Sequence, residues 1–134
     1  MPPERALLCH GLAVTTGVLT YLGALAIEGL ASGDLARTFA REAVDVGAYW
    51  YFALPVCYLV AGLLGYLGPV RTWRWSLDML ATHAVCMLLF AGSGLNLWPL
   101  ALLSALVLAL PGILTAWLGS LAHRGRTALP GARR

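Results

Sequence analysis

The chain contains no lysine, and charged residues make up only 11% of its 134 positions. Ordinary soluble domains carry roughly 25% charged residues. A soluble domain of this size also could not bury all of the hydrophobic residues, which are 60% of the chain. The mean hydropathy of +0.78 points the same way. The scarcity of charge therefore excludes an ordinary soluble domain and predicts an all-α membrane protein.

Cysteine is also scarce, with three residues at Cys9, Cys57 and Cys86. They are too few and too widely separated for a disulfide framework. Each lies inside a long apolar stretch, where a cysteine acts as a small hydrophobic residue. The cysteines therefore predict neither an extracellular disulfide scaffold nor a metal cluster.

Catalytic motifs are absent as well. The sequence has no glycine loop of the phosphate-binding kind, no HExxH motif and no nucleophile with a base at a recognisable spacing. Ser93 lies between two glycines, as in a nucleophile elbow, but that elbow requires a preceding strand. No enzyme activity is expected, and no motif identifies a family.

Four long apolar stretches are present and are joined by short links. This pattern predicts a four-transmembrane-helix up-and-down bundle as a single domain over 1–123, followed by a basic, disordered tail over 124–134. The first stretch is too long for a signal peptide, whose apolar region has about 7–15 residues, so an uncleaved span is expected. The predicted spans are 6–31, 48–68, 77–95 and 98–123.

Residues 34–46 separate their polar and apolar positions by helical spacing. Such a segment predicts a short amphipathic helix lying in the membrane interface between the first and second spans. The apolar side holds Leu35, Ala36, Phe39, Ala43 and Val46, and the polar side holds Asp34, Arg37, Arg41 and Asp45.

The arginines predict the orientation. An even number of spans places both termini on one side together with the turn at 71–75, and that side holds seven of the nine arginines. The positive-inside rule then places both termini in the cytoplasm, with the protein in the plasma (inner) membrane. Because the basic residues flank spans and form no basic face, nucleic-acid binding is not expected. The predicted membrane anchors are Arg71, Trp73, Arg74, Trp75, Arg124 and Arg126.

Two helix faces gather polar groups. In the third span, five residues fall within an arc of about 80° at 100° per residue; we call them the polar stripe. The first span repeats polar and small residues every 3.5 positions. Because lipid offers no hydrogen bonds, we expect both faces to meet inside the bundle, across its centre. The stripe is Asp78, Thr82, Cys86, Ser93 and Asn96; the first-span face includes His10, Gly17, Tyr21 and Glu28.

Small residues indicate where helices approach closely. Gly17, Gly62 and Gly65 lie on predicted packing faces. Pro111 lies near the middle of the fourth span and predicts a bend there.

Three functions fit these patterns. The first is a non-enzymatic accessory or self-associating subunit, which acts by helix packing with a membrane-protein partner or as a homo-oligomer in lipid. The second is an oligomeric carrier of a small solute, ion or proton, because ionisable groups inside a span predict function. The third is haem ligation by His10 and His83. His83 and Cys86 alone are two ligands on one turn and make no metal site, so no cofactor is expected.

Overall fold

The computed structural model describes residues 3–34, 47–90 and 98–128. Within these ranges every regular element is a helix: α1 (Pro3–Ser32), a π-helical turn η2 (Tyr49–Ala53) that continues into α3 (Leu54–Leu67), α4 (Trp73–Phe90) and α5 (Trp98–Ala128). The interfacial helix predicted at 34–46 lies almost entirely outside the described residues, as do Ser93 and Asn96.

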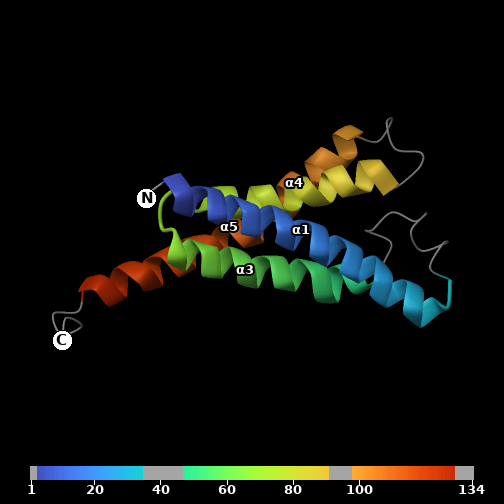
Figure 1. The fold of residues 1–134 in the computed structure, drawn as a ribbon, viewed down its shortest axis with the longest axis horizontal. Helices are drawn as coiled ribbons and strands as arrows, with labels where there is room; N and C mark the ends of the chain where they lie inside the picture. Colours follow the sequence, from blue (N-terminus) through green and yellow to red (C-terminus); the bar gives the residue numbers. More distant parts are fainter. Residues whose placement is uncertain (1–2, 35–46, 91–97, 129–134) are drawn as a thin grey trace.

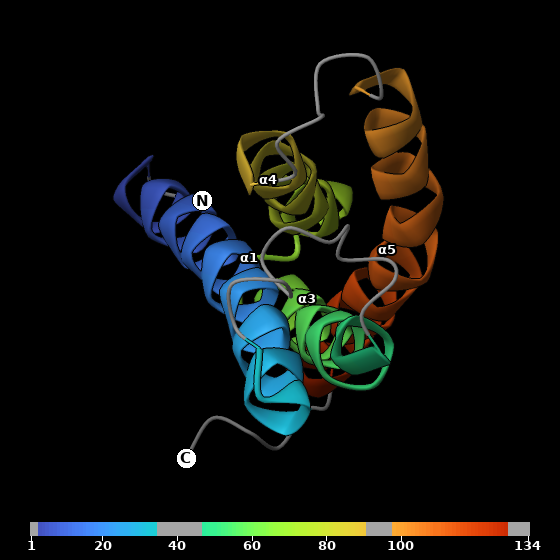
Figure 2. The ribbon, with the colours of Figure 1, turned by 90° about the vertical axis from the view of Figure 1, so that its right-hand side faces the viewer.

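The helices alternate in direction, as an up-and-down bundle requires. Figure 1 shows the start of α1 and the end of α5 at the same end of the bundle. Viewed along the bundle in Figure 2, α1 and α5 lie on opposite sides, with α3 and α4 between them. Both middle helices contact both outer ones. The first and third predicted spans therefore pack directly against each other rather than across the centre.

Three helices are long and apolar enough to cross a membrane: Glu4–Ser32, Tyr49–Leu67 and Leu102–Arg126. The third predicted span is not among them. Its helix α4 has 18 described residues, and Arg74, Asp78 and His83 lower its mean hydropathy. The fold thus contains the four predicted helices, of which three have the composition of a membrane span.

Helix ends follow local chemistry. Pro3 starts α1, where its missing N–H costs nothing, and Gly33 ends it with a φ of 72° in the left-handed conformation that glycine tolerates. Between α3 and α4, Arg71 has a positive φ of 56°. This tight turn lets α4 begin at Trp73, earlier than the predicted start at 77. At the other end, α5 continues past the predicted end at 123 through Arg124 and Arg126.

Glycine allows α3 and α5 to touch backbone to backbone. A Cβ atom at Gly65 would overlap the carbonyl oxygen of Ala116, and one at Gly119 would overlap that of Gly62. Thr115 adds a hydrogen bond to the same contact, because its hydroxyl donates to the carbonyl oxygen of Tyr58 at 2.9 Å. The predicted packing faces at Gly62 and Gly65 thus lie in the α3–α5 contact.

Gly17 likewise allows α1 and α4 to approach each other closely. Its Cβ atom would lie 2.7 Å from the carbonyl oxygen of Met79 and 2.9 Å from the Cβ of Thr82. Any larger residue would separate the two helices at this level.

Pro111 lies within α5 and has no N–H, which weakens the helix in the preceding turn. Two carbonyls of that turn accept hydrogen bonds from neighbouring helices. Tyr58 donates to the carbonyl of Leu108 at 2.9 Å, and Ser76 donates to that of Ala109 at 3.0 Å. Figure 2 shows α5 curving around α3 and α4. The weakened turn is therefore hydrogen-bonded to both α3 and α4.

Candidate functional site

His83 lies at the centre of the bundle with an exposed fraction of 1%. Both of its ring nitrogens have partners. The Nδ1 atom lies 3.1 Å from the hydroxyl oxygen of Tyr49, and the Nε2 atom lies 3.0 Å from the hydroxyl oxygen of Thr20. One imidazole thus joins three segments of the chain: α1, η2 and α4.

The direction of each hydrogen bond follows from Thr20. Its hydroxyl oxygen lies 2.7 Å from the carbonyl oxygen of Thr16, which can only accept. The single hydroxyl hydrogen of Thr20 is therefore donated to Thr16. Toward His83 the Thr20 oxygen must accept, so the ring carries its proton on Nε2, and Nδ1 accepts from the hydroxyl of Tyr49. The order of donors is Tyr49, His83, Thr20, ending at the carbonyl of Thr16.

Cys57 of α3 completes this group. Its sulfur lies 3.3 Å from the Thr20 hydroxyl oxygen and 3.7 Å from Nε2 of His83. The thiol is 2% exposed and forms no disulfide. We call Thr20, Tyr49, Cys57 and His83 the central polar group; its four members come from four different elements.

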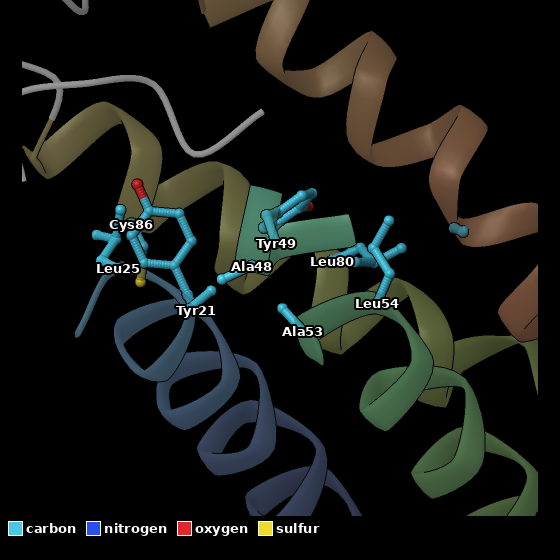
Figure 3. Close-up of a cluster of buried hydrophobic side chains, with 10 residues drawn as sticks. Tyr21, Leu25, Ala48, Tyr49, Ala53, Leu54, Leu80 and Cys86 are labelled. Atoms are coloured by element: carbon cyan, nitrogen blue, oxygen red, sulfur yellow. The ribbon is translucent and has the colours of Figure 1, made fainter. Parts of the chain in front are cut away.

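Aromatic rings and an aliphatic cluster close the central polar group on one side. The ring of Tyr21 lies 5.8 Å from that of His83, and the ring of Tyr49 lies 5.5 Å from it. Figure 3 shows Tyr21 and Tyr49 within a buried cluster that also contains Leu25, Leu80 and other apolar residues. Water therefore has no open route to His83 from this side.

The π-helical turn determines where Tyr49 points. A π turn inserts an extra residue per turn and shifts the direction of the side chains on it, and such turns are frequent at functional sites. Here Tyr49 is 1% exposed, whereas its neighbours Trp50 and Tyr51 are 50% and 66% exposed. The turn therefore aims one of three consecutive aromatic side chains into the bundle.

A second polar contact joins α1 and α4 near the end where the chain starts. The Nδ1 atom of His10 lies 2.5 Å from a carboxylate oxygen of Asp78. Both side chains are partly exposed, at 38% and 29%. The ring of Trp75 stands edge-on to that of His10, with centroids 4.9 Å apart. This pair lies at the surface of the bundle, unlike the central polar group.

The polar stripe forms the edge of the buried face of α4. Asp78 and Thr82 are half-buried, and Cys86 is 6% exposed. Thr82 donates to the carbonyl of Asp78 in its own helix, at 2.7 Å. At 100° per residue, the buried positions of α4 centre on His83, about 100° from Thr82. Because α1 and α5 cover different sides of α4, its buried face is wider than one stripe.

The remaining predicted polar residues of α1, Tyr21 and Glu28, lie in different surroundings. Tyr21 is buried, and its ring stacks on that of Phe90 with centroids 6.3 Å apart. Glu28 lies near the C-terminal end of α1 and accepts a hydrogen bond from the backbone N–H of Ala48 at 3.4 Å. That bond holds the start of η2 against α1.

Among the predicted anchors, Trp75 differs from expectation. It is 2% exposed, and its indole N–H lies 3.4 Å from the carbonyl oxygen of Gly68. The early start of α4 turns Trp75 inward. Trp73 stays 47% exposed, with the guanidinium of Arg74 5.5 Å from the centroid of its ring. The other predicted anchors, Arg71, Arg124 and Arg126, are exposed, and Arg126 donates to the hydroxyl of Tyr66 at 2.9 Å.

The sequence patterns considered His83 only as a haem or metal ligand, and they missed its partners Thr20, Tyr49 and Cys57. One signal was available: Thr20 lies within the first span at a depth close to that of His83. In the structure, both ring nitrogens of His83 are engaged by protein groups. Among the described residues, no group of three or more His, Cys, Asp or Glu side chains could hold a metal ion.

No family model, no curated protein and no solved structure matches the chain.

Proposed function

We propose that the protein is an integral membrane protein of the plasma (inner) membrane that acts without catalysis, as an accessory or self-associating subunit. Three helices have the length and composition of membrane spans, and α4 packs among them. Large apolar side chains face outward on every side; Leu19, Leu59 and Leu106 are 64%, 75% and 56% exposed. Lipid would cover these side chains at no cost, and α4 then serves as the fourth span with its polar residues turned inward.

One observation carries the proposal: a shallow, open groove on the outer face of α1. At about 100° per residue, this face lies opposite the one that packs on α4 through Ala13 and Gly17. At Gly11, no atom lies within 4 Å of the place that a Cβ would occupy. The groove is lined by Glu4, Leu7, Leu8, Gly11, Leu12 and Thr15.

The chemistry of this groove suits another helix better than it suits lipid. Gly11 and Thr15 are four residues apart, the spacing at which small residues let two membrane helices approach closely. The hydroxyl of Thr15 also gains a partner from a protein neighbour, which lipid tails cannot supply. Within the described ranges the interior needs nothing more, because every buried side-chain nitrogen and oxygen has a hydrogen-bond partner.

Replacing Gly11 with leucine should fill the groove and weaken association at least tenfold. The matched control is Ala81→Leu, which enlarges an outward residue of α4 by a similar volume. Native mass spectrometry of the protein in mild detergent would report the copies and partners bound to each variant. If the Gly11 variant retains its associated chains as fully as the control, α1 is not the associating face.

The arginine distribution gives a second test, of orientation. Reporter fusions after Arg134 and after Gly33 should give opposite signals, cytoplasmic for the first and periplasmic for the second. A periplasmic signal at Arg134 would reverse the proposed topology.

The alternative functions have weaker support. A proton carrier requires a continuous chain of exchangeable groups, yet the chain through His83 ends at the backbone carbonyl of Thr16, which cannot pass a proton on. Haem ligation by His10 and His83 requires both imidazoles to face one iron, but His10 lies partly exposed and paired with Asp78, whereas His83 is buried in the centre of the bundle. We therefore place the proposed association on the outer surface of the bundle.

A further inference from the structure

Three donor atoms from three helices meet inside the central polar group. They are the hydroxyl oxygen of Thr20 on α1, the sulfur of Cys57 on α3 and Nε2 of His83 on α4. The geometry points to a binding site for one soft monovalent metal ion, of the copper(I) or silver(I) kind, held by Cys57 and His83 with Thr20 beside it.

The distances between the donors fit a shared ion. Their separations are 3.0, 3.3 and 3.7 Å. A point equidistant from all three lies about 2 Å from each, close to the metal–nitrogen bonds of about 2.0–2.1 Å and metal–sulfur bonds of about 2.3 Å seen in zinc sites. A small outward movement of the sulfur would accommodate its longer bond. The three side chains already converge without a change of backbone.

Ligand type and charge select the kind of ion. A thiolate is a soft ligand that favours copper(I), and imidazole binds copper well. One thiolate balances a monovalent ion, so the occupied site is neutral. A divalent ion would leave a net charge among residues that are 1–4% exposed, where an uncompensated charge is costly. Sites with more thiolates or carboxylates suit divalent ions better, and none lies beside this group in the described chain.

Binding rearranges protons in a balanced way. The Cys57 thiol releases its proton as the sulfur–metal bond forms, so one proton leaves the protein for each ion bound. The imidazole proton moves from Nε2 to Nδ1, which frees Nε2 for the metal. Nδ1–H then donates to the hydroxyl oxygen of Tyr49, 3.1 Å away. A ligating histidine commonly donates its other N–H to such an acceptor, which orients the ring.

The proposed site is independent of association through α1. Its atoms lie in the bundle interior, whereas the α1 groove lies on the outer face. Either proposal can fail without affecting the other.

The test uses the full chain in detergent without oxygen. Silver(I) serves as a redox-inert probe, and copper(I) is titrated against a chromophoric copper(I) chelator. Because the donors are buried, each point is read after equilibration. The key variant is Cys9→Ser/Cys86→Ser, which leaves Cys57 as the sole cysteine without touching the site. We expect this variant to bind one ion per chain, with the Cys57 sulfur, one imidazole nitrogen and the Thr20 oxygen as neighbours in X-ray absorption spectra.

Further variants locate the site. Cys57→Ser should weaken binding at least a hundredfold, and Tyr49→Phe should weaken it about tenfold through loss of the orienting hydrogen bond. If Cys57→Ser does not fold, the Cys9→Ser/Cys86→Ser variant decides alone. No binding by that variant, or an ion with sulfur but no nitrogen neighbour, would overturn the proposal. The central polar group would then be a hydrogen-bonded packing element only.

Discussion

Replacing Gly65 with alanine is expected to lower the free energy of unfolding by about 1–3 kcal/mol, the usual cost of overpacking a core. A single methyl group is enough, because a Cβ atom there would overlap the carbonyl oxygen of Ala116. Both groups belong to helix backbones, so neither can turn aside as a flexible side chain could. The α3–α5 contact must open to admit the methyl group. Thermal or denaturant unfolding in detergent would measure the loss.

Gly125→Ala, in α5, is the matched control for this prediction. It makes the same change in a helix, at a position where nothing lies within 4 Å of the new atom. Alanine favours a helix over glycine by roughly 0.5–1 kcal/mol, so the control should be neutral or slightly more stable. If the free energy of unfolding falls at Gly65 but not in the control, the cost comes from the close approach of α3 and α5. Equal stability of the two variants would show that α3 and α5 do not touch at Gly65.

The glycine contacts could be predicted because glycine spacing on a helix reports directly on close approach. Gly17, Gly62 and Gly65 were all placed on packing faces from the sequence, and each lies against another helix. The partner of each face could not be predicted in this way. Spacing indicates which side of a helix packs, but which helix covers it depends on the arrangement of all four.

The position of His83 shows the limit of reading a helix by its polar residues. The polar stripe was identified by polarity, which predicts one face in contact with one neighbour. In the structure α4 contacts α1 and α5 on different sides, and apolar residues such as Met79 and Leu80 complete its buried arc. His83 lies at the centre of that arc. The least exposed polar residue of α4 therefore lies outside the stripe.

Local backbone geometry explains the other differences. The π-helical turn directs Tyr49 into the bundle and leaves the neighbouring Trp50 and Tyr51 50% and 66% exposed. Arg71 adopts a positive φ, and the turn it shortens brings Trp75 into the bundle. Neither event has a signal in hydropathy, since both depend on a shift of one or two residues in register.

The second large effect on stability is expected from a substitution in the central polar group. Tyr49→Phe removes the hydroxyl that donates to Nδ1 of His83 and leaves that nitrogen buried without a partner. An unsatisfied buried polar group costs about 1–3 kcal/mol, and we expect a loss of that size in the free energy of unfolding. Tyr51→Phe, two residues away on a side chain that is 66% exposed, is the matched control and should change stability by less than about 0.5 kcal/mol.

A second substitution separates the hydrogen bond from general packing. In a His83→Leu background there is no Nδ1 atom to satisfy, and the Tyr49 hydroxyl itself becomes the group without a partner. Tyr49→Phe should then cost nothing or even restore stability, because removing both partners of a buried hydrogen bond is far cheaper than removing one. The coupling between the two changes, about 1–3 kcal/mol by a double-mutant cycle, measures the contact directly. Additive losses would mean that Tyr49 and His83 stabilise the bundle separately, and the proton order assigned from Tyr49 through His83 to Thr20 would have to be abandoned.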